Sequence, residues 1–99
     1  MADSSYLIGY DLHEGEDYTD LEDAIKKLGS TWWHALDSTW IIRHPGSATV
    51  IRNALKPHLK NPDKAGGDKL LVVKLTGEAA WTGSFKESSK KWLLTNLPA

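Results

Sequence analysis

The sequence predicts an α+β fold in which strands and helices alternate along a single domain, residues 1–99. At 99 residues, the chain has the usual length of one domain. Its apolar fraction of 40% and its charged fraction of 25% are ordinary for a globular protein. Short apolar runs also alternate with segments whose apolar residues recur at helical spacing. These three observations predict the class, and each element follows from local patterns.

The amino-terminal part predicts a buried strand, a loop and a helix. Residues 6–10 are a short aromatic and aliphatic run, which the polar residues 11–17 end. Residues 19–22 have the form of a capping box, so we expect a helix to begin there. Gly29 is expected to stop this helix in the left-handed conformation. The apolar stripe of the helix is Leu21, Ala24, Ile25 and Leu28.

The next segment predicts a hairpin and a second helix. Residues 31–42 are rich in Trp, Thr and Ile, and the polar pair at 37–38 divides them into two strands joined by a tight turn. Ser47 is expected to cap the helix that follows. Pro57 lacks an N–H group, so this helix should end or kink near Lys56. Its inner face is predicted to carry Val50, Ile51, Ala54 and Leu55.

The carboxyl-terminal third predicts one more strand and a tail. Residues 68–76 form a mostly continuous apolar run, which is typical of a strand in the centre of a sheet. Residues 84–87 favour a helix that buries Phe85, Trp92 and Leu93. An edge strand over 92–97 is the alternative.

The resulting order is strand, helix, strand, strand, helix, strand, with two right-handed crossovers into one antiparallel sheet. This order predicts a ferredoxin-like βαββαβ sandwich with an additional C-terminal element. Both helices would then cover one face of the sheet. The tail or a second subunit would have to cover the opposite face.

Composition narrows the classes of function. There is no cysteine, so disulfides and thiolate chemistry are excluded, and 12 basic residues against 13 acidic ones create no global field toward nucleic acid. Glycine-rich phosphate loops and a Gly-x-Ser-x-Gly elbow are absent from the sequence. Neither a secretion signal nor a membrane-spanning run is visible. We therefore expect a soluble, cytoplasmic protein that does not use a membrane.

Three blocks resemble those of the bacterial SinR-family proteins, namely residues 6–12, 37–42 and 75–81. More remotely, Tyr10-Asp11 and Ser38-Thr39-Trp40 are similar to blocks of the CRISPR-associated protein two family. That resemblance implies a ferredoxin-like homodimer in which strand-end aspartates meet around a divalent metal. Some members of that family are nucleases and others are scaffolds. Residues 34–37 differ from the basic and glutamine positions usual in that family.

One candidate site is acidic. Asp11 follows a strand, from which a carboxylate can reach a hard cation such as Mg²⁺. A symmetry-related Asp11, or His13 and Glu16, would have to complete the metal site. In this interpretation Asp11 is also the catalytic residue of a metal-dependent ribonuclease or deoxyribonuclease. The alternative is that Asp11 only caps a turn by accepting backbone N–H bonds.

The other candidate site is aromatic and basic. Strand alternation places Trp32 and His34 on one sheet face and Trp33 on the other. Aromatic rings beside arginine can stack on the bases of RNA or DNA, or can anchor a protein partner. Core packing or a homodimer interface is the alternative. The residues predicted for nucleic-acid or partner binding are Trp32, His34, Trp40, Arg43 and Arg52.

The preferred interpretation is a ferredoxin-like homodimer that binds a macromolecule, with binding favoured over catalysis. The first alternative is the metal-dependent nuclease that uses paired Asp11. The second is a protein–protein interaction module whose surface is rich in tryptophan.

Overall fold

Strands and helices alternate along the chain as the sequence predicts, and a further helix follows the last strand. The computed structural model describes residues 3–12, 18–76 and 79–97. Within them the elements are β1 (Ser4–Asp11), α1 (Thr19–Leu28), β2 (Trp32–Leu36), β3 (Thr39–His44), α2 (Ala48–Leu55), the 3₁₀ turn η1 (Lys56–His58), β4 (Lys69–Leu75) and α3 (Glu87–Asn96). The hairpin turn at 37–38 is confirmed.

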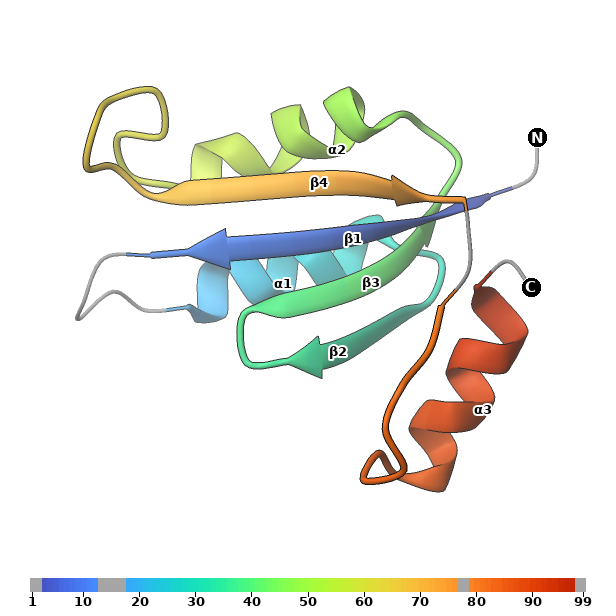
Figure 1. The fold of residues 1–99 in the computed structure, drawn as a ribbon. Coiled ribbons are helices and arrows are strands. Elements are labelled where there is room, and N and C mark those ends of the chain that lie inside the picture. Colours follow the sequence, from blue (N-terminus) through green and yellow to red (C-terminus); the bar gives the residue numbers. More distant parts are fainter. Residues whose placement is uncertain (1–2, 13–17, 77–78, 98–99) are drawn as a thin grey trace.

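The strands form one antiparallel four-stranded sheet in the order β2-β3-β1-β4 (Figure 1). The α+β class is therefore confirmed. The prediction that β4 is central is wrong, because β4 lies at an edge. Leu71 and Val73 of this strand are 61% and 41% exposed. A long apolar run predicts a strand that is buried on both faces, but along β4 exposed and covered apolar residues alternate.

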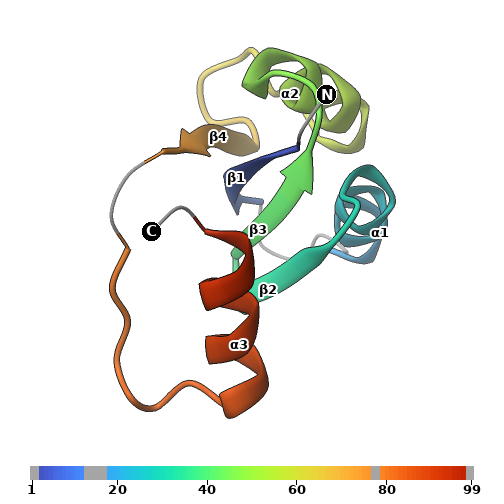
Figure 2. The ribbon, with the colours of Figure 1, turned by 90° about the vertical axis from the view of Figure 1, so that its right-hand side faces the viewer.

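One face of the sheet packs against α1 and α2, and this layer holds the main core (Figure 2). Tyr6, Ile8 and Tyr10 are buried because alternate residues of β1 point to the same face. The fully buried side chains that pack against them come from β3, on the same face of the sheet, and from both helices. They include Trp40, Ile42, Leu21, Ile25, Ile51 and Leu55.

The other face is covered in part by α3, which lies across the sheet from α1 and α2 (Figure 2). Leu93 of this helix is buried, and the ring centroids of Trp33 of β2 and Phe85 are 5.3 Å apart. The Trp33 indole N–H donates to Ser89 Oγ at 3.1 Å, and the Trp92 indole N–H donates to Thr31 Oγ1 at 3.0 Å. The tail is thus a helix and not an edge strand, but the helix begins at Glu87 after Lys86 without a side-chain cap, so the predicted start at Ser84 is wrong.

Two predicted details of α1 are wrong. The helix begins at Thr19, but its N-cap is Tyr18 and no side-chain capping bond forms there. Gly29 is extended, with φ −80° and ψ 140°, and so does not supply a left-handed stop. A Cβ at Gly29 would lie 2.8 Å from the Thr31 carbonyl oxygen and 3.0 Å from Ile42 Cβ. Glycine is therefore suited to this position by close approach to neighbouring strands.

The second helix follows its predicted limits more closely. Ser47 Oγ accepts a hydrogen bond from the Val50 N–H at 3.2 Å, as the cap prediction requires. The α-helix ends at Leu55, and Pro57 lies in the 3₁₀ turn that follows. Ile51 and Leu55 are buried, but Val50 and Ala54 are exposed, so half of the predicted inner face is wrong. An eight-residue helix on a sheet buries only a narrow stripe.

No helix in the described ranges has the length and apolar character needed to cross a membrane.

Candidate functional site

Trp32, His34 and Trp40 gather on the helix-covered face at the β2 edge, where strand alternation predicts that Trp32 and His34 share a face. The His34 and Trp40 rings stack, with centroids 4.1 Å apart and an interplanar angle of 11°. Trp32 lies 5.2 Å from Trp40, and Lys26 Nζ lies 5.2 Å from the centroid of the Trp32 ring. Trp40 is only 1% exposed, whereas Trp32 is 41% exposed. The accessible part of this cluster is therefore Trp32 and the side of His34 away from Trp40.

A polar network ties the aromatic cluster to α1. The Trp40 indole N–H donates to the Tyr10 hydroxyl at 3.1 Å, and that hydroxyl donates to Glu22 Oε2 at 3.1 Å. Burial, assisted by the negative charge of Glu22, raises the pKa of Tyr10 to about 12. His34 Nε2 lies 3.1 Å from the carbonyl oxygen of Asp37 in the hairpin turn. These bonds hold Trp40 inside the molecule, where it cannot stack on a ligand.

The two predicted arginines lie away from the aromatic cluster. Arg43 points to the opposite sheet face, where Nη1 donates to Ser5 Oγ at 2.9 Å and to the Asn96 carbonyl at 3.1 Å. Its Nη2 donates to the Asp3 carbonyl at 2.7 Å. Arg52 lies on α2, beside β4. The structure therefore splits the predicted binding set among three places.

Asp11 ends β1, is exposed, and pairs in register with Lys69 at the end of β4. His13 and Glu16, which were predicted to complete a metal site with it, lie outside the described residues. Among the described residues, no group of three His, Asp or Glu side chains is close enough to hold a metal ion. The Mg²⁺ site therefore stays a prediction.

Among the described residues, one side of the β4 backbone pairs with no other strand, and the hydrogen bonds of β1 show which residues face that side. The Tyr10 N–H donates to the Ser38 carbonyl at 3.1 Å, so Tyr10 directs its backbone groups toward β3. Neighbouring residues of a strand direct these groups to opposite sides, so Gly9 faces β4, where it pairs with Leu71. The residues of β4 that direct N–H and C=O to the free edge are Leu70, Val72 and Lys74.

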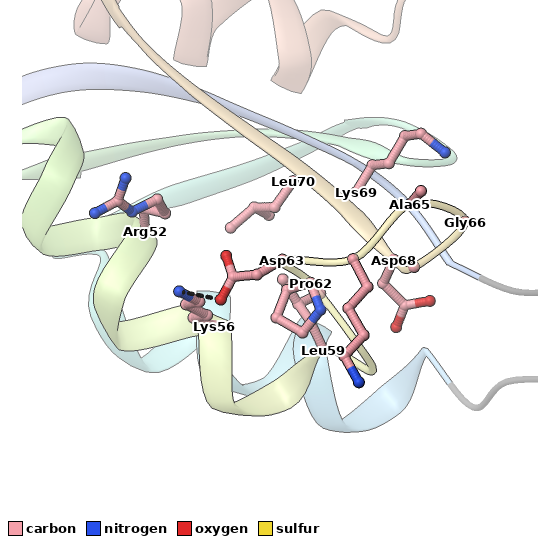
Figure 3. Close-up of a pocket in the computed structure, with 12 residues that line it drawn as sticks. Arg52, Lys56, Leu59, Pro62, Asp63, Ala65, Gly66, Asp68, Lys69 and Leu70 are labelled. Atoms are coloured by element: carbon pink, nitrogen blue, oxygen red, sulfur yellow. Dashed lines mark ion pairs between the residues drawn. The ribbon is translucent and has the colours of Figure 1, made fainter.

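A chain of three hollows follows this edge along α2. The first, of about 390 Å³, lies between α2 and the loop at residues 59–68 (Figure 3). It shares Arg52 and Leu70 with a second hollow of about 200 Å³ beside the middle of β4. That hollow shares Ala48 with a third, of about 470 Å³, which extends to Lys74. We call this row of hollows between α2 and β4 the edge groove.

Among the described residues, five basic side chains line the edge groove, against the two acidic ones of Asp63 and Asp68. Lys56 Nζ lies 2.7 Å from Asp63 Oδ2, the ion pair drawn in Figure 3. Asp68 is 3% exposed, and its carboxylate accepts the Lys60 backbone N–H at 2.8 Å. The Arg52 guanidinium donates to the neutral amide oxygen of Asn53, at 3.2 Å from Nε and 3.0 Å from Nη2. Arg52 forms no ion pair with a carboxylate in the part of the chain that the structure describes.

Sequence reasoning named Arg52 but missed the edge groove beside it. A signal was present, because Lys69 and Lys74 interrupt the apolar run of β4, and charged residues are typical of strand edges. The pairing of β4 with β1 alone could not be read from the run itself.

Comparison with known proteins finds no match for this chain among family models, curated proteins or solved structures. The resemblances to the SinR family and to the CRISPR-associated protein two family therefore stay predictions.

Proposed function

We propose that this chain is a ferredoxin-like binding protein that accepts an extended segment of a partner protein as a further strand on β4. The observation that carries the proposal is the free β4 edge, whose outward backbone groups at Leu70, Val72 and Lys74 lie beside a groove. Among the described residues, no hydrogen bond to another segment uses these backbone groups. An unpaired edge of this kind is a template for strand addition.

The ferredoxin-like assignment is supported by the element order and by the strand order β2-β3-β1-β4. In the first strand-helix-strand unit, β3 lies between β1 and β2. In the second unit, β1 lies between β3 and β4. Both crossover helices, α1 and α2, lie on the same face (Figure 2).

An added strand would both pair with the outward backbone groups of β4 and cover its exposed apolar side chains. The main-chain groups of the added strand would bond to Leu70, Val72 and Lys74. Its side chains on the open face would cover Leu71 and Val73, whose apolar surface now faces solvent. Burial of apolar surface contributes about 25 cal/mol per Å². Main-chain bonds and apolar contact would thus act at the same place.

A proline substitution tests the proposal with little risk to the fold. Lys74 is exposed, and its N–H points outward, so Lys74→Pro removes an edge donor without breaking the β1–β4 ladder. Lys74→Ala is the matched control, because it removes the same side chain and keeps the N–H group. The probe is a phage-displayed library of random peptides of about ten residues, slightly longer than a typical strand.

We expect wild type and Lys74→Ala to select a common set of peptides that Lys74→Pro fails to bind. Failure of the wild type to select any peptide would overturn the proposal. Equal retention by Lys74→Pro would do the same, because binding would then use another surface. Salt-dependent binding of single-stranded RNA or DNA without peptide selection would point instead to the accessible Trp32 and His34.

The homodimer predicted from the sequence competes for the same edge, since a second copy could pair β4 with β4. Hydrogen exchange separates the two occupants. In a monomer, the amides of Leu71, Val73 and Leu75 should exchange slowly and those of Val72 and Lys74 quickly. Slow exchange at Val72 together with a doubled solution mass would assign the edge to a second copy.

The nuclease prediction has its own test. Labelled RNA and DNA are incubated with and without Mg²⁺, with wild type and with Asp11→Ala, whose side chain is exposed in the structure. Cleavage that needs both Mg²⁺ and Asp11 would establish the nuclease. Equal cleavage by both proteins would remove Asp11 from any catalytic role.

A further inference from the structure

Arg52 lies where two hollows of the edge groove meet, because it lines both the hollow beside the loop and the hollow beside the middle of β4. In Figure 3 the Arg52 side chain lies on α2 beside the hollow, and its guanidinium points away from the Lys56–Asp63 pair. Its described hydrogen bonds go only to the neutral side chain of Asn53. A cation in this position is available to a ligand lying in the groove.

We infer that the edge groove selects a strand carrying an acidic side chain, whose carboxylate pairs with the guanidinium of Arg52. This inference rests on the proposed strand addition and specifies its partner. A planar guanidinium matches a carboxylate in a two-bond geometry, and such charge-assisted hydrogen bonds are about twice as strong as neutral ones. The bound segment therefore carries sequence information through this side chain.

Strand alternation gives the segment a pattern. Side chains of an added strand that point to the open face meet Leu71 and Val73, so apolar residues are favoured there. Side chains that point to the other face enter the groove between β4 and α2, where Arg52 lies. The partner strand should thus alternate apolar residues with polar ones, and at least one polar residue should be Asp or Glu.

Charge disfavours a second copy of this chain in the groove. In a twofold β4–β4 pair, the same surface of each copy meets itself. The residues of α2 contain Arg52 but no Asp or Glu, and β4 itself contains Lys69 and Lys74. Such a pair would bring like charges together, whereas an acidic strand would offset them.

The experiment uses two synthetic peptides of alternating valine and threonine with blocked ends. One has a glutamate at a central polar position, and its twin has glutamine there. Each is titrated into the full chain, and the backbone amide signals of β4 are followed by NMR. The protein variants are Arg52→Gln, Arg52→Glu and, as a control of similar charge change on another exposed surface, Lys91→Gln.

We expect the wild type and Lys91→Gln to bind the glutamate peptide about five- to tenfold more tightly than its twin. Arg52→Gln should bind both peptides equally, and Arg52→Glu should prefer the glutamine twin, because its carboxylate repels the glutamate. A glutamate preference that survives in Arg52→Gln would overturn the inference. Shifts in β4 with no preference in the wild type would also overturn it while leaving strand addition in place. Absence of any shift in β4 with either peptide would reject both.

Discussion

The two edges of the sheet are both rich in apolar side chains, but only the β2 edge is covered, and only in part, because Leu36 there remains 59% exposed. At the β2 edge, Trp33 packs against Phe85 and Trp92 of the tail, and its indole donates to Ser89. At the β4 edge, the loop that follows α2 leaves the strand free, and Leu71 remains 61% exposed. Whether a strand is buried depends on which elements reach it, and composition alone does not decide this.

We expect the two edges to differ in what a substitution changes. Substitutions in the covered β2 region should change the free energy of unfolding, because they remove packing and buried hydrogen bonds. Substitutions at the free β4 edge should leave folding nearly unchanged and alter binding.

The largest effect on stability is expected from Trp40→Ala. This ring is 1% exposed, stacks on His34 and donates to Tyr10. Truncation of a buried aromatic residue costs about 3–5 kcal/mol. Urea unfolding followed by circular dichroism measures the loss. The control is Trp32→Ala, which truncates a 41% exposed ring of the same cluster and should lower the free energy of unfolding by about 1 kcal/mol or less. Equal losses in the two variants would contradict the division between the buried ring and the accessible one.

A smaller loss is expected at the docked tail. Leu93 of α3 is 4% exposed, whereas its neighbour Leu94 is 72% exposed. Leu93→Ala should lower the free energy of unfolding by about 2 kcal/mol, and Leu94→Ala by less than about 0.5 kcal/mol. The matched pair controls for helix propensity because the substitution is the same. If Leu94→Ala were the more damaging, α3 would have to dock through its other side.

High pH should lower the free energy of unfolding through Tyr10 of β1. Burial raises the pKa of this phenol from 10.0 to about 12 in the folded chain. Below pH 10 both states keep the proton and the stability is complete. Between pH 10 and 12 the unfolded chain releases the proton while the folded chain keeps it, so stability falls as the pH rises.

Comparison with Tyr10→Phe isolates this contribution from other groups that titrate at high pH. The free energy of unfolding of the wild type should decline more steeply than that of the variant between pH 10 and 12. Parallel profiles over this range would show that the phenol titrates alike in both states.

The smallest effect on stability is expected at the free edge. Leu71→Thr should change the free energy of unfolding by no more than about 0.5 kcal/mol, since the side chain is exposed and threonine suits strands. The same change should weaken peptide binding several-fold. Leu36→Thr, at a residue of the β2 edge that is 59% exposed, is the matched control and should leave binding unchanged. Equal weakening by both would place the binding surface elsewhere.

Local patterns in the sequence predict much of the fold. The turn at 37–38, the Ser47 cap and the helix end before Pro57 follow from the chemistry of single residues, and the structure contains all three. The position of β4 does not follow from such patterns, because an apolar run does not reveal which strand pairs with it. The capping of α1 failed for a related reason, since Tyr18 precedes Thr19 as the N-cap and a sequence pattern fixes the cap only to within a residue or two.

The site was predicted less completely than the fold. Alternation placed Trp32 and His34 together, because it is a property of one strand. Arg43 and Arg52 lie on different elements, and their separation depends on the three-dimensional arrangement of the sheet and α2. The edge groove also arises from residues distant in sequence, 48–52 and 69–74 among them.

The guanidinium of Arg43 has a consequence for the order of folding events. It joins the carbonyl groups of Asp3 and Asn96, which lie near opposite ends of the chain, and it also bonds to Ser5. Ser5 and Arg43 become neighbours only when β1 has paired with β3. The receiving site for the end of α3 thus does not exist before the central pair forms, and docking of the last helix should report that β1 and β3 have paired.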